Sequence, residues 1–412
     1  MLPKRHLDIN NPKFVYNPYP FLAGLRETLP IFYDEEWQKV WVLRYGDIAT
    51  LLKDRRLGRQ ILHVMTREEL GWPPPNPAQA PFDYFQSKHM LDREPPDHTR
   101  LKTLVMKAFT PQRVEALHQQ IQQIINELLD KVEPIGKMDL LHDLAEPLPV
   151  TVIAELLGIP EKDRHKLRPW SAAIVKLYEL GYTDAQVHAG SKAVIAFSDY
   201  IRNLAEERRT HPEDDLISAL VAVEEQGEKL TEDELIANCI LLLNAGHEAT
   251  VNAITGGMLT LFRHPEQKQE LTRAAADSAT GTALFKSAVE ELLRHDTPLP
   301  MFERWVLQDF EYKGIALKRG MEVGLMFASG NRDPRRFERP DELVLTRKDN
   351  AHFTFSLGTH YCLGAPLARL ELQLVFQTLL RRFPKIRLAT DADRLEYGGF
   401  VIRGLRSLPV VF

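Results

Sequence analysis

The sequence predicts a mainly α-helical protein with a minor β-sheet region and one long helix through its centre. Apolar residues recur at steps of three and four between residues 112 and 132, which indicates an amphipathic helix. Apolar residues run almost all round a second helix, from residue 235 to 262. Strand-like segments are short and few. No linker divides the 412 residues, so we expect a single domain over residues 1–412.

The predicted strands lie towards the two ends of the chain. Residues 31–33 and 40–43 flank a polar turn and predict a hairpin. Residues 310–326 predict short strands around Gly314 and Gly320. Between these regions, residues 72–81 contain five prolines and predict a loop, since proline removes backbone donors and fixes φ. Such a loop is either an inert surface segment or the border of a binding site.

The long central helix has a polar interruption. Thr231 and Glu234 form a capping box at its start, and Pro265 marks its end. A helix that is apolar on every side is buried, yet residues 244–250 read Asn-Ala-Gly-His-Glu-Ala-Thr. Burying a carboxylate and an imidazole is unfavourable unless they are paired or solvated. The segment is either a satisfied polar network or a water-lined active site in which Gly246 makes room for a ligand.

Composition excludes several classes of protein. The formal charge is 52 minus 57, or −5, without the basic excess typical of nucleic-acid binding. Two cysteines, Cys239 and Cys362, cannot form a disulfide framework, which favours a reducing compartment. The N-terminus lacks the apolar core of a signal peptide, and the most apolar uncharged stretch, residues 235–246, is shorter than the roughly 20 residues of a membrane span. We therefore expect a soluble, cytoplasmic protein.

Cys362 lies in the most informative segment of the chain. Glycines on both sides allow tight turns and close approach of the backbone to a flat ligand. Pro366 fits the first turn of a following helix, so Cys362 precedes a helix N-terminus, where the helix dipole stabilises a thiolate. No second cysteine is near, which disfavours a zinc or iron–sulfur site.

The segment F-x-x-G-x-H-x-C-x-G resembles the haem-binding signature of the cytochrome P450 superfamily, through Phe355, Gly358, His360, Cys362 and Gly364. Further matches follow in the right order and cover essentially the whole chain. Residues 291–294 (Glu-Leu-Leu-Arg) resemble the E-x-x-R helix, residues 331–341 the meander before the cysteine loop, and residues 92–110 a helix that flanks the haem. The resemblance implies a single-domain cytochrome P450 fold with the long helix over the haem, of the bacterial type.

The resemblance also implies the roles of individual residues. Cys362 is the expected iron ligand, beside haem b as the cofactor, and Phe355 and Gly364 are expected next to the sulfur. Glu291 and Arg294 are expected to form a buried structural network, with Arg347 as a third member. The expected cations for the haem propionates are His98, Lys102, Arg304 and His360. Many relatives have arginine where this chain has Lys102, which offers a point charge in place of a planar fork.

The sequence departs from the family in its oxygen-activating motif. Residues 245–248 resemble A-G-x-[D/E], but the alcohol that usually follows the acid is replaced by Ala249, and Thr250 comes one residue later. Successive helix residues are rotated by about 100°, so Thr250 does not simply replace the missing hydroxyl. Glu248 remains the expected proton carrier. Our hypothesis is that a substrate hydroxyl or an ordered water supplies the missing donor.

The implied activity is that of a monooxygenase which hydroxylates or epoxidises a hydrophobic organic substrate. No flavin or ferredoxin module is evident, so the electrons are expected from a separate ferredoxin or flavodoxin-type donor with its reductase, docked through Lys102, Lys107 and Arg369. Two alternatives stay open at this point, a peroxide-using oxygenase and a haem-binding sensor or carrier. The expected pocket lining is mainly apolar and consists of residues 72–90, 241–244, 299–302 and 400–402.

Overall fold

The computed structural model describes residues 2–179, 181–223, 227–277 and 281–412. It confirms a mainly helical protein with small sheets. Contacts divide the chain into two compact units. The first unit comprises Met1–Leu57, Ile121–Leu148 and Glu248–Phe412, and the second comprises Gly58–Gln120 and Pro149–His247.

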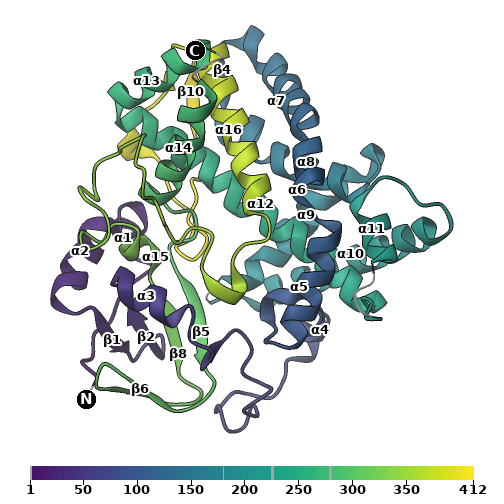
Figure 1. Ribbon diagram of the computed structural model, residues 1–412, viewed down its shortest axis with the longest axis vertical. Helices are drawn as coiled ribbons and strands as arrows, with labels where there is room; N and C mark the ends of the chain where they lie inside the picture. The colour runs from purple at the N-terminus through teal and green to yellow at the C-terminus, as the bar shows by residue number, and fades with distance from the viewer. Residues whose placement is uncertain (1, 180, 224–226, 278–280) are drawn as a thin grey trace. The chain divides into compact units, whose positions relative to one another are not determined.

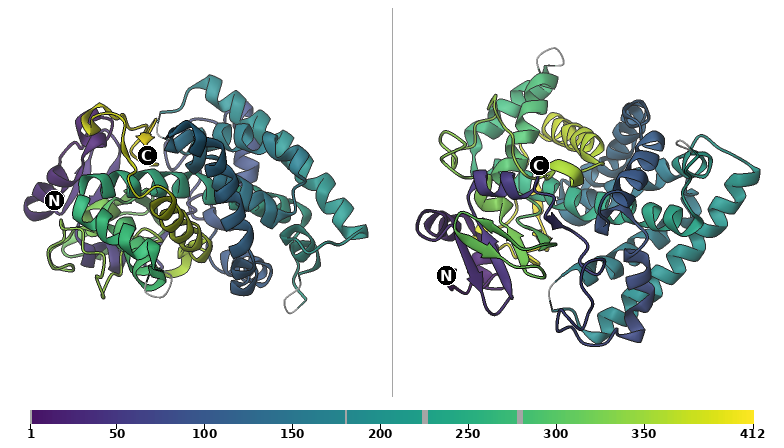
Figure 2. Two further views of the ribbon diagram at one scale, coloured as in Figure 1. Left: turned by 90° about the horizontal axis from the view of Figure 1, so that it is seen from above. Right: turned by 60° about the horizontal axis from the view of Figure 1, so that its bottom comes forward.

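A five-stranded sheet organises the first unit. Its strand order is β1-β2-β8-β5-β3, formed by Ile31–Asp34, Lys39–Val42, Glu322–Leu325, Phe302–Val306 and Leu57–Gly58. The predicted hairpin is confirmed, since β1 and β2 pair antiparallel with Ile31 opposite Val42. Strand β2 then pairs parallel to β8, which brings the N-terminal strands beside the late green strands (Figure 1; Figure 2, right). Residues 31–58 and residues 302–325 therefore build one sheet.

Smaller strand pairs complete the first unit. The hairpin of β6 (Phe310–Tyr312) and β7 (Ile315–Leu317) precedes β8, which confirms the predicted strands around Gly314 and Gly320. A three-stranded sheet joins β4 (Lys137–Asp139), β10 (Pro409–Val411) and β9 (Arg387–Leu388). The α-helices that lie wholly in the described part of this unit are α1 (Pro12–Tyr16), α2 (Tyr19–Thr28), α3 (Tyr45–Leu51), α13 (Pro265–Ala276), α14 (Gly281–His295), α15 (Phe327–Gly330) and α16 (Ala365–Arg382).

The second unit is built from helices. Its longest, α10 (Asp184–Thr210), packs against α9 (Leu167–Val175) and α11 (Leu216–Ala222). The proline-rich segment is only partly the predicted loop, because Asn76 caps a short 3-10 helix at Pro77–Gln79 that leads into α4. Proline is tolerated there, since the first turn of a helix has free N–H groups in any case. The remaining helices are α4 (Ala80–Gln86), α5 (Asp97–Ala108), α6 (Pro111–Ala116) and most of α8 (Pro147–Leu157).

The amphipathic segment 112–132 is two helices, where the periodicity predicted one. Helix α6 ends at Ala116, and α7 (His118–Val132) starts after Leu117. The apolar stripe survives this break, because Val114, Leu117, Ile121, Ile125 and Leu129 are all buried. Periodicity reports which side chains share a face and is insensitive to a local change of the helix axis.

Helix α12 (Glu232–Arg263) is the predicted long helix, and both units contain part of it. The predicted capping box is present, since Thr231 Oγ1 accepts from the Glu234 N–H and Glu234 Oε2 accepts from the Thr231 N–H. Most of its length is buried. In the part of the chain that the structure describes, neither this helix nor another is long and apolar enough to cross a membrane.

Gly246 on α12 does not open space for a ligand, contrary to our interpretation of the sequence. A Cβ added there would lie 3.1 Å from Ile153 Cδ1 on α8. That distance is shorter than an ordinary van der Waals contact. The glycine therefore allows close packing of α8 against α12.

Candidate functional site

The Cys362 loop is held in a conformation that its sequence requires. Gly358 has φ +72°, and an added Cβ would lie 2.9 Å from the Leu52 carbonyl oxygen, so only glycine fits. The Cys362 N–H donates to the Phe355 carbonyl oxygen at 3.0 Å and closes the loop. Helix α16 begins at Ala365, with Gly364 at its N-cap position. The loop thus presents Cys362 just before a helix N-terminus.

The two cysteines have opposite environments. Cys239 is fully buried in α12, and burial raises the pKa of its thiol, which keeps it protonated. Cys362 is exposed, and neither thiol is in a disulfide. Of the two cysteine thiols, the accessible one is therefore at the position that the sequence singles out.

The residues around Cys362 fit a haem group. A Cβ added to Gly364 would meet only the Cys362 Sγ, at 4.0 Å, so no neighbouring atom blocks that side of the loop for a flat ligand. Among the described residues, no group of three or more His, Cys, Asp or Glu side chains is arranged to hold a metal ion. A lone thiolate suits an iron whose equatorial ligands come from a porphyrin.

A charged cluster packs against Phe355 of the cysteine loop. Arg369, on α16, makes a bidentate ion pair with Glu290 at 2.7 and 2.9 Å, and its guanidinium lies 4.3 Å from the centre of the Phe355 ring. His352 also contacts Glu290, at 3.2 Å. Burial alone would raise the Glu290 pKa, but hydrogen bonds from His352 and Arg369 outweigh it and lower the pKa to about 2. The cluster fixes the aromatic ring beside the loop.

Sequence reasoning missed this cluster and misassigned Arg369. We expected Arg369 to be available for a redox partner, whereas the structure engages it with Glu290 and Tyr361. The sequence gives only the direction of this side chain: Arg369 lies four residues, or about one helical turn, after Ala365 at the start of α16, and helical side chains tilt towards the N-terminus.

Glu291 and Arg294 form a fully buried pair in α14. Arg294 Nε and Nη2 donate to the two Glu291 carboxylate oxygens, both at 2.8 Å, and each side chain is 0% exposed. Arg347 Nε donates to the same carboxylate at 3.0 Å. Arg294 also donates to the carbonyl oxygens of Asn331 and Pro340. Burial would raise the Glu291 pKa, but Arg294 outweighs it and holds the pKa below its usual value. The network ties α14 to the segment before the cysteine loop.

The four candidate propionate ligands occupy different elements. Arg304 is 2% exposed on β5 and donates to its neighbour's carbonyl oxygen, and His360 is half-buried in the 3-10 turn before Cys362. Both belong to the first unit. His98 is 3% exposed on α5, with Lys102 half-buried one turn later, and both belong to the second unit.

The polar middle of α12 is the least buried part of this helix interior. Ala245 is exposed, while Glu248 and Ala249 are half-exposed. Thr250 is only 4% exposed. The hydroxyl of Thr250 therefore has a different environment from Ala249, as the helical rotation predicts.

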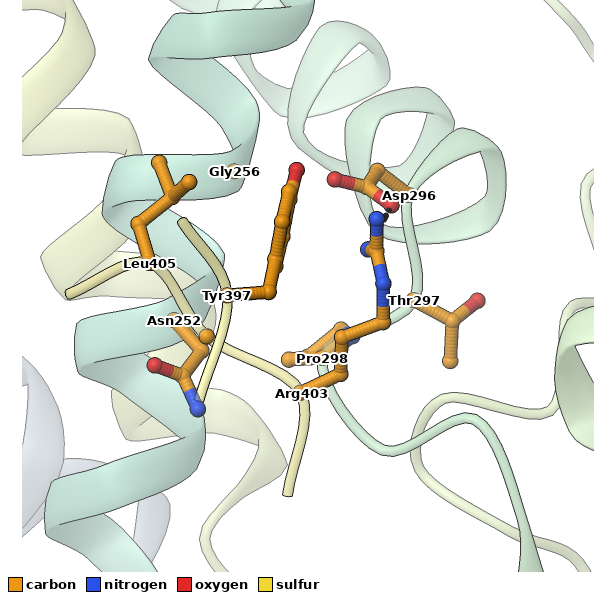
Figure 3. Close-up of a pocket in the computed structure, with 9 residues that line it drawn as sticks. Asn252, Gly256, Asp296, Thr297, Pro298, Tyr397, Arg403 and Leu405 are labelled. Atoms are coloured by element: carbon orange, nitrogen blue, oxygen red, sulfur yellow. Dashed lines mark hydrogen bonds and ion pairs between the residues drawn. The ribbon is translucent and has the colours of Figure 1, made fainter. Parts of the chain in front are cut away.

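Two cavities of the first unit lie away from Cys362. One is a narrow gap with essentially no room for a water molecule, lined by Asn252, Gly256, Asp296, Thr297, Pro298, Tyr397, Arg403, Gly404 and Leu405. Figure 3 shows Arg403 facing Asp296 beside the Tyr397 ring, and the ion pair measures 2.6 Å. The other, an open groove of about 630 Å³, is lined by residues of α14 and by residues 346–350. The first cavity is too small for a drug-sized ligand.

The Arg403 contacts join residues that border two expected pocket segments, 299–302 and 400–402. The Arg403 N–H donates to the Pro298 carbonyl oxygen at 3.1 Å, and Arg403 Nε donates to the Val15 carbonyl oxygen at 2.7 Å. Met301 and Phe400, which we expected in the pocket lining, are 1% and 2% exposed in an apolar cluster with Trp41. The sequence identifies these segments as apolar but does not show which face of each is buried in the core.

This fold and this cysteine loop define a haem-thiolate oxidoreductase. The cytochrome P450 family model matches residues 60–396, and the chain belongs to this family. It is thus an oxygen-incorporating monooxygenase of the cytochrome P450 class, and its cofactor is haem.

Relatives match over nearly their whole length. The chain is 41% identical to the polyketide biosynthesis cytochrome P450 PksS of Bacillus subtilis, over 97% of this chain and 96% of that one. It is 36% identical to the biotin biosynthesis cytochrome P450 of the same organism, over 97% of each. The solved structure of PksS superimposes with a TM-score of 0.88 at 39% identity, covering 98% and 99% of the two chains. The structure of P450BioI bound to an acyl carrier protein ligated to hexadec-9Z-enoic acid gives 0.87 at 36%, covering 98% and 100%.

Proposed function

We propose that this protein uses haem b, bound through Cys362, to insert one atom of dioxygen into a C–H bond or an alkene of a hydrophobic organic molecule. The observation that carries the proposal is the exposed Cys362 thiol on a glycine-framed loop at the start of α16. When bound, the haem iron supplies the redox chemistry that activates dioxygen. The protein's part is to hold the group, exclude water and move protons.

In this proposal His98, Lys102, Arg304 and His360 bind the propionates. Burial of His98 and Arg304 supports the assignment, because a charged hydrogen bond is stronger where water is excluded. Phe355, held by Arg369, shields the sulfur on one side. Gly364 leaves the sulfur accessible to N–H donors, which tune its electron donation.

Proton delivery is assigned to Glu248. Its half-exposed position lets the carboxyl exchange protons with water, whereas Ala249 carries no hydroxyl to hold a proton near the reacting atoms. A substrate hydroxyl or an ordered water supplies that donor in our proposal, since Thr250 is buried.

The change Ala249→Thr tests this assignment. We expect more product per electron consumed with substrates that lack a hydroxyl, because the new alcohol supplies the missing donor. One positioned proton-transfer group typically contributes about 10²-fold or more to a rate, so the gain in product per electron should be readily measurable. The measurement compares product with consumed reduced nicotinamide cofactor, and Thr250→Val serves as the control. If hydroxyl-free substrates already couple as tightly as hydroxylated ones in the unmodified enzyme, the assignment is wrong.

Electrons come from a separate ferredoxin or flavodoxin-type donor with its reductase in this proposal. Lys107, exposed on α5, is the docking cation of this proposal, because Lys102 is assigned to the propionates. We further propose that the protein works in the cytoplasm, where cysteines that form no disulfide stay reduced.

The substrate is proposed to be acyl-chain-like. Two relatives carry names that refer to polyketide and biotin biosynthesis, and one solved relative holds a fatty acyl chain on a carrier protein. Flexible chains of this kind fit the apolar residues that the sequence places in the pocket-lining segments.

Isotope-labelled dioxygen tests the proposed function. The reconstituted enzyme is given a reductase system, a fatty acid and ¹⁸O₂, and the product is analysed by mass spectrometry. We expect one labelled oxygen atom per product molecule. A second candidate, favoured by Ala249, is peroxide-driven oxygenation, in which the label appears only when supplied as peroxide. Absence of labelled product in both arms would contradict both functions.

A further inference from the structure

Asn244 on α12 is a buried amide without a hydrogen-bond partner. The side chain is 4% exposed, and both Nδ2 and Oδ1 lie inside the protein without a partner in the described structure. Burying an amide without hydrogen-bond partners is unfavourable. The unfavourable burial of this side chain needs a compensating interaction.

A second asparagine of the same helix, Asn238, is an example of a buried amide with a structural role. Asn238 is 0% exposed, but its Oδ1 accepts from the Met90 N–H at 3.2 Å and its Nδ2 donates to the Glu234 carbonyl oxygen at 2.7 Å. Its amide is satisfied by the chain itself. Asn244, six residues later, has no corresponding pair of contacts.

The helix geometry separates Asn244 from the packing face of α12. Gly246 faces Ile153 of α8, as the 3.1 Å approach of an added Cβ shows. Residues two apart on a helix are rotated by about 200°, so Asn244 points away from that face. The neighbouring Ala245 is exposed although Leu241 and Leu243 are buried. The amide therefore lies next to the one accessible stretch of this part of the helix.

We propose that Asn244 is a specificity-determining residue that binds a hydroxyl group of an otherwise hydrophobic ligand. An amide presents a donor and an acceptor, and an alcohol can satisfy either of them, whereas an ether or ketone only accepts. The inference rests on the proposed function and adds the chemical class of the substrate, a hydroxylated aliphatic chain. The amide rejects a plain hydrocarbon, because its polar atoms then stay unpaired.

The test compares the enzyme carrying Asn244→Leu with the unmodified enzyme, both with haem. The probes are a medium-chain primary alcohol, its methyl ether and the alkane of the same length, and binding is measured by calorimetry and by the Soret shift. We expect Asn244→Leu to weaken binding of the alcohol about tenfold, to weaken the ether less and to leave the alkane unchanged or tighter. Asn238→Leu is the matched control, and we expect it to leave the ranking of the probes unchanged.

Stability without ligand gives a second, independent measurement. Removal of an unpaired buried amide is expected to raise the midpoint of thermal unfolding by about 1–2 °C, whereas Asn238→Leu lowers it. If Asn244→Leu destabilises the protein, weakens all three probes equally or leaves alcohol binding unchanged, the inference is wrong. It is also wrong if the unmodified enzyme binds the alcohol no better than the alkane. Failure of the proposed function would instead appear as absent oxygen incorporation with these binding ratios intact. Asn244→Val repeats the comparison should the leucine variant fail to fold.

Discussion

The variant Cys362→Ala is expected to lose oxygenase activity, and its reduced carbon monoxide complex is expected to lack the red-shifted Soret band of thiolate-ligated haem. We expect this because Cys362 is the accessible thiol and lies where a helix N-terminus favours a thiolate. Without the anionic sulfur, the iron loses the electron donation that promotes O–O cleavage. We expect activity to fall by at least about 10³-fold, a loss as large as that of a well-positioned catalytic group.

Cys239→Ala is the matched control. Cys239 is buried, and burial raises the pKa of its thiol, so it behaves as a small apolar side chain. The expected result is an unchanged Soret band with a modest loss of stability. Equal spectra for the two alanine variants would contradict the assignment of Cys362, as would a histidine-type spectrum of the unmodified protein.

The parts of the fold that sequence could predict are those with a local cause. The hairpin of β1 and β2 and the capping box of α12 depend on residues close together in the chain. The pairing of β2 with β8 joins residues about 280 positions apart, and no local pattern encodes it. The break at Leu117 likewise depends on tertiary packing, which periodicity does not report.

The residues of the candidate site likewise divide into those that the sequence could predict and those that it could not. Cys362 could be identified because glycine, cysteine and proline each have a conformational or chemical reason to be where they are. The Glu290 contacts of Arg369 and the Asp296 contact of Arg403 could not, since a charged residue in a sequence shows neither its partner nor its burial. Gly246 has the residue type that suits a ligand site, but its use is helix packing.

Loss of Arg294 is the second large effect that we expect, and it concerns folding. Arg294→Met leaves the Glu291 carboxylate charged and fully buried, which is unfavourable by about 3–5 kcal/mol. It also removes donors from the Asn331 and Pro340 carbonyl oxygens. Since a protein's total stability is about 5–15 kcal/mol, we expect poor haem retention and a strongly lowered urea midpoint.

A surface pair of the same spacing provides the control for this prediction. Arg394 and Asp391 are also three residues apart, but they are 77% and 81% exposed and 3.7 Å apart. Arg394→Met should therefore change the free energy of unfolding by less than about 1 kcal/mol. Equal losses in Arg294→Met and Arg394→Met would show that burial of the α14 pair contributes nothing.

Acid titration separates the charge of Glu291 from its packing. Its pKa is held below the usual value in the folded protein, so its stabilising contribution is complete above the unfolded pKa of about 4.3 and is lost as the pH falls through the lower folded pKa. The stability difference between the unmodified protein and Glu291→Gln should accordingly shrink below about pH 4 in urea unfolding. A difference that stays constant on acidification would assign the effect to the N–H donors of the glutamine amide, because an amide of the same shape differs from the carboxylate only in charge and in these donors.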